Sequence, residues 1–393
     1  MGDNLLSEIT SAINYVMRGG MNPDPELEAI EQQIVAAAYH RFKNIPTFAK
    51  MGLKWTYNWT HFNTFWMSKD PDIQKLLYKK RMYPQYIEVE TTTACNLKCR
   101  ICEHTYWDEP NVHMTLEQFK YIVEQFPDLK WIGMTGIGEA WCNPEFGDML
   151  RYIKSKNVYV ELYDSFYYTD DDKARLQVEL GIEKVFVSLD GATPESYNSI
   201  RVGSDFNKVL DNVKRLDKWK RRLNSYFPEL CFHFIVTQDN IHELVTYLEM
   251  IKDSGIDCHM VQYTRMLHDF PEVKDLFVEV TPEQIEEVTK RGNELGIMVG
   301  WNATVPKIKP PIKQCLAWWM PFIFVDGTVI PCCALNEQND REWQRETSLG
   351  NIFETSFKEI WNGRKYKHML DMLCKNKIPV NCERCSIYEN PDR

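Results

Sequence analysis

The stretch that decides the fold is Tyr86-Ile-Glu-Val-Glu-Thr91, followed at once by Thr92-Thr-Ala-Cys95-Asn-Leu-Lys-Cys99-Arg-Ile-Cys102. Its first six residues are rich in β-branched and aromatic side chains, which is typical of a strand. Three cysteines then follow at the spacing CxxxCxxC. A strand that runs straight into a cysteine-rich loop predicts a metal site at the carboxyl end of that strand.

Five more β-rich runs follow along the chain, and amphipathic helix patterns separate them. The runs are 130–135, 158–163, 184–189, 231–236 and 258–263. Six strand–helix units in series predict a parallel sheet, and six are too few for a closed eight-fold barrel. We therefore expect an α/β fold whose core, residues 86–300, is a partial (β/α)6 TIM-like barrel or an open sheet. Capping-box patterns at Thr115/Gln118 and Thr281/Gln284 predict the starts of two helices.

Two further segments flank this core. Residues 1–85 carry apolar side chains at helical spacing and predict a helical N-terminal extension. Its aromatic stretch, 55–66, is expected to pack the extension against the core, and it is also compatible with a substrate entrance or contact with a membrane surface. Residues 301–393 break the strand–helix rhythm. There, Asp326-Gly327 between two β-rich runs predicts a two-residue hairpin, and thus a small C-terminal β-hairpin/helix module.

The composition excludes several classes of protein. The 393-residue chain has a formal net charge of −10, which argues against a nucleic-acid partner. No stretch approaches the ~20 apolar residues of a membrane span, and residues 1–20 do not resemble a signal peptide. We therefore expect a cytoplasmic protein. In that reducing compartment the twelve cysteines predict metal binding rather than disulfides.

The first cysteine group suggests catalysis. Cys95, Cys99 and Cys102 can ligate three irons of a 4Fe–4S cluster and leave the fourth iron without a protein ligand. An open iron can bind a chelating substrate, whereas a fully ligated cluster can only store and transfer electrons. A zinc knuckle is the alternative interpretation of these three cysteines taken alone.

CxxxCxxC after the first strand of a six-unit β/α domain resembles the radical S-adenosylmethionine (SAM) superfamily. The resemblance implies that the open iron binds the amino and carboxylate groups of SAM. It also implies that reduction of the cluster cleaves SAM to a 5′-deoxyadenosyl radical, which abstracts a hydrogen atom from the substrate. A low-potential electron donor such as flavodoxin or ferredoxin is then an expected partner, beside SAM and an unidentified substrate.

The same resemblance implies a set of SAM ligands. Gly136-Ile-Gly138-Glu139-Ala140 is similar to the family's glycine-rich motif ending in Gly-Glu-Pro, with Ala140 in place of the proline. Gly136 and Gly138 would let the backbone approach SAM closely, and Glu139 would accept hydrogen bonds from the SAM ammonium group.

Later strand ends supply the other expected SAM ligands. Ser188 and Asp190 occupy a segment that meets the SAM ribose in related enzymes, and Arg201 corresponds to an arginine that pairs with the SAM carboxylate. Ile101 and the segment beginning at Asp164 depart from the family pattern, which leaves the adenine and substrate contacts open.

A second cysteine group lies near the C-terminus. The predicted hairpin would carry Cys332 back towards Cys315, and Cys382-Glu-Arg-Cys385 is a CxxC pair. Four cysteines in two sequence groups can hold zinc or a fully ligated 4Fe–4S cluster.

This region resembles the SPASM and shorter twitch modules, which carry auxiliary iron–sulfur clusters. No cysteine follows Cys385, so one auxiliary cluster of the twitch type is expected. Cys333 is an alternative to Cys332 as a ligand, and the role of Cys374 stays open.

Several functions fit these patterns. The resemblance implies substrate oxidation or oxidative bond formation, with the auxiliary cluster as electron acceptor. Peptide-modifying relatives often carry a winged-helix recognition domain with strands, and residues 1–85 show little strand alternation. That pattern favours a small molecule, lipid or carbohydrate as substrate, with a peptide-modifying enzyme (a RiPP or protein maturase) as the alternative. A non-catalytic iron–sulfur or zinc scaffold is an alternative of another class.

Overall fold

The structure is a computed structural model that describes Ala36 and residues 83–267, 270–302, 320–333, 340–375 and 377–385. Most of the expected helical extension, including the aromatic stretch 55–66, lies outside the described residues, and so does Cys315. Among the described residues, no helix combines the length and the apolar composition of a membrane span.

Seven parallel strands form the main body of a curved sheet, in the order β1-β3-β4-β5-β7-β8-β9. Their bounds are β1 (Tyr86–Val89), β3 (Trp131–Met134), β4 (Tyr159–Asp164), β5 (Lys184–Ser188), β7 (Glu229–Val236), β8 (Cys258–Arg265) and β9 (Met298–Asn302). The expected α/β fold with a partial parallel barrel is confirmed. One parallel strand more than expected, β9, follows the sixth unit and crosses the expected domain boundary at residue 300.

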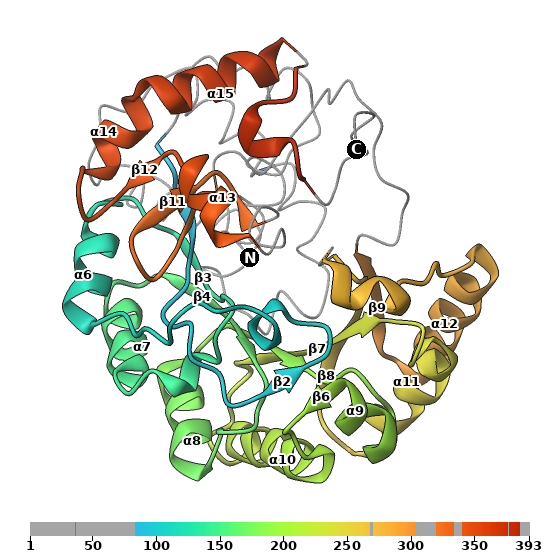
Figure 1. Ribbon diagram of the computed structural model, residues 1–393. Helices are drawn as coiled ribbons and strands as arrows, with labels where there is room; N and C mark the ends of the chain where they lie inside the picture. Colours follow the sequence, from blue (N-terminus) through green and yellow to red (C-terminus); the bar gives the residue numbers. More distant parts are fainter. Residues whose placement is uncertain are drawn as a thin grey trace.

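Helices connect these strands and cover the outer side of the sheet (Figure 1). They are α6 (Leu116–Glu124), α7 (Phe146–Ser155), α8 (Asp171–Leu180), α9 (Pro194–Ile200), α10 (Phe206–Arg222), α11 (Leu244–Asp253) and α12 (Pro282–Leu295). Both predicted capping boxes are present. The Thr115 side chain caps α6 and the Thr281 side chain caps α12, each with the glutamine three residues later.

Alternation along the strands decides which side chains face the site. Ile132, Val160, Val185, Phe232 and Val261 are fully buried in the core formed with the outer helices. Because side chains alternate along a strand, their neighbours in sequence face the inner side of the curved sheet. The inner side is therefore lined by the polar and aromatic residues of the same strands.

The C-terminal segment extends the same sheet at its other edge. Strand β10 (Phe322–Ile323) pairs in parallel with β1, and β11 (Thr328–Ile330) and β12 (Gly350–Asn351) follow it as antiparallel neighbours. Three helices complete this part: α13 (Arg341–Glu346), α14 (Phe357–Asn362) and α15 (Arg364–Cys374). The C-terminal residues are thus joined to the barrel by strand pairing, although domain boundaries at 85/86 and 300/301 stay predictions.

The predicted hairpin is present, but its turn is longer than expected. Phe324 N donates to Thr328 O and Gly327 N donates to Phe324 O, each at 2.9 Å, so Val325, Asp326 and Gly327 form a three-residue loop. A two-residue type I′ turn needs positive φ at both central residues, and only Gly327 has one, at 85°. The expectation of a two-residue turn was therefore wrong by one residue.

Candidate functional site

The first cysteine group lies in the loop after β1. Cys99 belongs to β2 (Lys98–Cys99), which pairs antiparallel with β6 (Arg201–Val202). Leu97 N lies 3.4 Å from Cys95 Sγ, and Cys102 N donates to Cys99 O at 3.2 Å. Cys99 belongs to a buried apolar cluster of side chains, and Cys95 and Cys102 pack against that cluster. The structure therefore brings Cys95, Cys99 and Cys102 together at the carboxyl end of β1.

The surroundings of these thiols fit a bound iron cluster. Burial, with smaller contributions from nearby Glu139 and Cys99, raises the pKa of the Cys95 thiol to about 12. Burial also raises the pKa of Cys99 and of Cys102. Cysteine binds metal as the thiolate, so these buried thiols would lose their protons only when a metal cation binds to the sulfur atoms. No three His, Cys, Asp or Glu side chains among the described residues converge as for a single metal ion. Three thiols gathered in one apolar loop can ligate three irons of a 4Fe–4S cluster.

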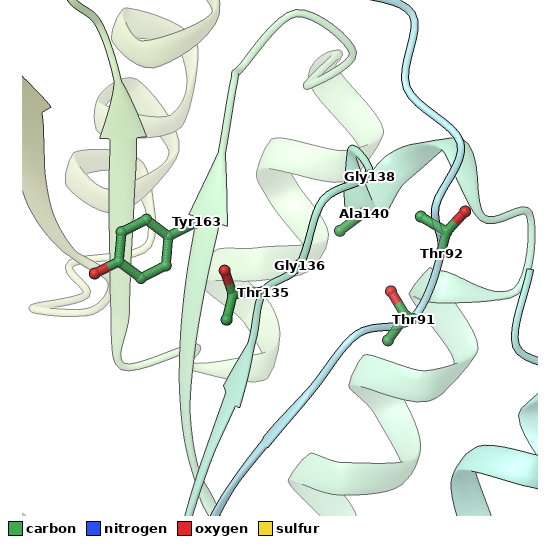
Figure 2. A pocket seen from close by; sticks show the side chains of 7 residues that line it. All are labelled: Thr91, Thr92, Thr135, Gly136, Gly138, Ala140 and Tyr163. Carbon is green, nitrogen blue, oxygen red and sulfur yellow. The ribbon is translucent and has the colours of Figure 1, made fainter. Parts of the chain in front are cut away.

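The glycine-rich loop after β3 packs against the cysteine loop. Glu139 N donates to Ala94 O at 2.9 Å. A Cβ atom added to Gly138 would lie 2.4 Å from Thr92 O, so only glycine allows this close approach of two backbones. A small pocket opens here, lined by Thr91, Thr92, Thr135, Gly136, Gly138, Ala140 and Tyr163 (Figure 2).

Glu139 has the features of a ligand for a buried cation. Its carboxylate is buried, and Oε2 accepts a hydrogen bond from Ser165 N at 3.1 Å. Oε1 is buried without a hydrogen-bond partner. Burial, followed by the nearby Asp164 carboxylate, raises the pKa of Glu139 to about 8. An oxygen left unpaired in this way is costly unless a donor arrives, and the ammonium group of SAM is such a donor.

The structure joins two of the remaining expected ligands into a pair. Asp190 is fully buried, and Arg201 Nε donates to its Oδ2 at 2.6 Å. Its Oδ1 accepts from Ile235 N at 2.7 Å, so both carboxylate oxygens have protein partners. A ribose contact for Asp190 stays a prediction, and the geometry shows that Asp190 holds Arg201. Ser188 lies at the end of β5, opposite His233 of β7.

Arg201 is placed beside the first cysteine group. Its Cα lies opposite that of Cys99 in the β2/β6 pair. Burial opposes the charge of Arg201, but Asp190 and Cys99 outweigh it and raise the pKa of the guanidinium. Arg201 is therefore a fixed cation next to Cys99. A residue that binds the carboxylate of a cluster-bound SAM would need this charge and this position.

The second cysteine group is brought together in part. Cys332 and Cys385 are buried in one apolar cluster with Phe322, Phe324 and Ile330, and Cys333 packs against it. Cys385 N donates to Cys382 O at 3.1 Å, which closes the CxxC turn. Cys374 is exposed at the end of α15 and does not belong to that cluster. The choice between Cys332 and Cys333 as ligand stays open.

An aromatic group on the inner side of the sheet was not identified from the sequence. The rings of Tyr163 and Phe186 stack at 4.6 Å with an angle of 10°, and the His233 ring meets Tyr163 edge-on at 5.6 Å. His233 Nε2 lies 2.9 Å from Thr264 Oγ1. Tyr163 lines the pocket and is 37% exposed. The two-residue alternation of the strands is the signal that could have identified this group.

Comparisons with known proteins agree with this arrangement. A model of the radical SAM superfamily matches residues 89–251, and a model of the SPASM iron–sulfur cluster-binding domain matches residues 315–386. The tungsten-containing aldehyde ferredoxin oxidoreductase cofactor-modifying protein of Pyrococcus furiosus is 25% identical, covering 78% of this chain and 89% of its own. The subtilosin biosynthesis protein AlbA of Bacillus subtilis is 24% identical, covering 77% of this chain and 64% of its own.

A solved structure has the same fold over most of the chain. Streptococcus suis SuiB bound to S-adenosylmethionine aligns with a TM-score of 0.63 and 13% identity, covering 94% of this chain and 92% of its own. The cysteine loop and the glycine-rich loop lie within the residues that the radical SAM model matches, and the second cysteine group lies within those that the SPASM model matches. The chain therefore carries a radical SAM superfamily domain followed by a C-terminal SPASM domain, and it is an enzyme that uses SAM, a 4Fe–4S cluster and auxiliary iron–sulfur binding.

Proposed function

We propose that this enzyme modifies a peptide. The observation that carries the proposal is the extent of its similarity to peptide-modifying relatives. AlbA, a bacteriocin biosynthesis protein, aligns over 77% of this chain. SuiB bound to its precursor peptide SuiA aligns over 94% of it, with a TM-score of 0.60 and 13% identity. The small molecule, lipid or carbohydrate expected from residues 1–85 has weaker support, since that expectation rests on residues outside those described.

The inner side of the sheet offers a place for a substrate side chain. Tyr163, Phe186 and His233 form an aromatic group that borders the pocket beside the glycine-rich loop. Stacked rings bind apolar or aromatic groups, and the His233–Thr264 pair can exchange hydrogen bonds with a polar one. We propose that this group contacts the residue to be modified.

The roles of the site residues follow from their positions. Cys95, Cys99 and Cys102 would hold the catalytic cluster, and Cys315, Cys332, Cys382 and Cys385 the auxiliary one. When bound, the catalytic cluster and SAM supply a 5′-deoxyadenosyl radical that takes a hydrogen atom from the substrate. Glu139 would bind the SAM ammonium group through its unpaired Oε1. Arg201, held by Asp190, would bind the SAM carboxylate. Gly136, Gly138 and Ser188 would border SAM.

A second candidate function is the modification of a non-peptide cofactor. The Pyrococcus furiosus relative is named as a cofactor-modifying protein, and this chain covers 89% of it. Heme-related and GTP-cyclising relatives also match this chain. The inner-face residues suit a planar small molecule as well as a peptide side chain, so a direct experiment must separate the two.

The experiment uses the protein reconstituted anaerobically with iron and sulfide, with dithionite in place of the expected flavodoxin or ferredoxin. Extract from the source cells is separated into a peptide fraction and a deproteinised small-molecule fraction. We expect the peptide fraction to stimulate release of 5′-deoxyadenosine, and protease treatment of that fraction to abolish the stimulation. The Cys99→Ala variant is the control and should release none. Stimulation by the small-molecule fraction alone would favour the second candidate.

A further inference from the structure

Glu90, which follows β1, is a buried carboxylate bound by three separate segments. It is 0% exposed. Its Oε2 accepts from Ile137 N of the glycine-rich loop at 3.1 Å and from Arg341 Nη2 of α13 at 2.5 Å. Its Oε1 lies 3.4 Å from Val325 N of the hairpin loop. One side chain thus connects the expected SAM loop with two elements of the C-terminal domain.

The glycine-rich loop lies directly on this carboxylate. A Cβ atom added to Gly136 would lie 2.5 Å from Glu90 Cγ and 3.0 Å from Glu90 Oε2. The hydrogen bond from Ile137 N to Glu90 Oε2 fixes the distance between the glycine-rich loop and this side chain. Any movement of the Glu90 carboxylate would therefore move the backbone that leads to Glu139.

Arg341 ties the same carboxylate to the second cysteine group. Arg341 is 7% exposed, and its guanidinium lies 3.6 Å from the centre of the Phe324 ring. Phe324 belongs to the apolar cluster that contains Cys332 and Cys385. Asp340, which caps α13 through Trp343 N, also pairs with Arg384 of the CxxC turn at 2.7 Å. The contacts run without interruption from the CxxC turn to the glycine-rich loop.

We propose that Glu90 and Arg341 are positioning residues that couple the order of the auxiliary-cluster domain to the geometry of the SAM-binding loop. Removing Arg341 would leave a buried carboxylate without its countercharge, and the carboxylate would rearrange and release Ile137 N. SAM then binds more tightly when the C-terminal domain is ordered around its cysteines. Because coupling between two sites is reciprocal, bound SAM also stabilises that domain.

The test compares Arg341→Met with Arg345→Met. Arg345 lies one turn further along α13 and joins Glu109 at 2.7 and 2.8 Å and Asp326 at 3.0 Å, so it also connects α13 to the barrel and to the hairpin loop, but through partly exposed side chains and not through Glu90. In SAM-free protein, hydrogen exchange at residues 136–138 should be faster in Arg341→Met and unchanged in Arg345→Met. In reconstituted protein, equilibrium dialysis with radiolabelled SAM should show a Kd raised about tenfold by Arg341→Met only.

Two further variants separate coupling from simple loss of folding. Glu90→Gln removes the buried charge, so Glu90→Gln/Arg341→Met should bind SAM more tightly than Arg341→Met alone. Cys385→Ala should raise the SAM Kd in the wild-type background and change it little in the Arg341→Met background. Unchanged exchange and unchanged SAM Kd in Arg341→Met would overturn the proposal. So would an effect of Cys385→Ala that is equally large in both backgrounds.

Discussion

Cys99 and Arg201 lie opposite each other in the short antiparallel pair β2/β6, although one hundred and two positions separate them in the chain. The Arg201 guanidinium is held by Asp190, whose Oδ2 accepts a hydrogen bond from Nε at 2.6 Å. The β2/β6 pair and the buried ion pair with Asp190 therefore fix the position of Arg201, the expected partner of the SAM carboxylate, relative to Cys99 of the expected catalytic cluster.

This relationship predicts a strict need for the guanidinium. Arg201→Lys keeps the charge but loses the planar fork that binds Asp190 through Nε, so the ammonium cannot serve two carboxylates in the same geometry. We expect the SAM Kd, measured by equilibrium dialysis, to rise about tenfold or more. Arg175→Lys is the matched control, since Arg175 forms a surface ion pair with Glu179 and its loss should change nothing. An unchanged Kd in Arg201→Lys would limit Arg201 to a structural role.

Glu139 predicts a pH dependence of stability. Its pKa is raised from 4.5 to about 8, so between these values the folded state keeps a proton that the unfolded state has released. The free energy of unfolding of SAM-free protein should therefore fall as the pH rises from about 5 to about 8. Urea unfolding at several pH values measures this slope, which Glu139→Gln should reduce. Equal slopes for the two proteins would contradict the prediction.

The same carboxylate predicts that SAM binding releases a proton. The SAM ammonium group favours the ionised form of Glu139, which at neutral pH is the minor form in the SAM-free protein. Calorimetry at pH 7 in two buffers of different ionisation enthalpy should show proton release in the wild-type protein. Glu139→Gln should show less release and weaker binding. If the heat of binding does not depend on the buffer, Glu139 is not the ammonium ligand.

Gly138 predicts a large difference between two glycine substitutions. In Gly138→Ala the new methyl group would meet Thr92 O at 2.4 Å and Ala94 O at 2.7 Å, both backbone atoms that cannot turn aside. We expect it to lower the free energy of unfolding by about 1–3 kcal/mol and to impair iron binding. In Gly147→Ala, within α7, the new methyl group would lie 3.5 Å from Leu176, which is an ordinary van der Waals distance. We expect this substitution to be neutral or stabilising by up to ~1 kcal/mol. Equal stability of the two variants would show that the loops separate easily.

The second cysteine group predicts distinct iron contents. Cys332→Ser should lower the iron content of the reconstituted protein from about eight to about four per chain, because Cys332 lies beside Cys385 in one buried cluster. Cys374→Ser should leave the content unchanged, because Cys374 is exposed outside that cluster. If Cys333→Ser loses the iron and Cys332→Ser does not, Cys333 is the ligand.

Much of the fold could be predicted because its elements are encoded locally. The capping boxes at Thr115 and Thr281 each lie within four residues, and the β-rich runs are short and continuous. The turn at Asp326-Gly327 was placed correctly but one residue too short, because turn type depends on how many residues adopt positive φ. The strand β9 was missed because its five residues include Gly300 and Asn302, and glycine and asparagine are uncommon in strands.

The sequence by itself determined the spacing of the cysteines, the order of the strand ends and hence the family, because these features depend on residues close together in the chain. Only the tertiary structure decided which distant groups meet. The pairing of β2 with β6 joins Asp190 with Arg201, which are eleven positions apart in the chain. The pairing of β1 with β10 joins Glu90 with Arg341, which are 251 positions apart. Buried charges need partners, and which partner arrives depends on strand pairing that no local pattern records.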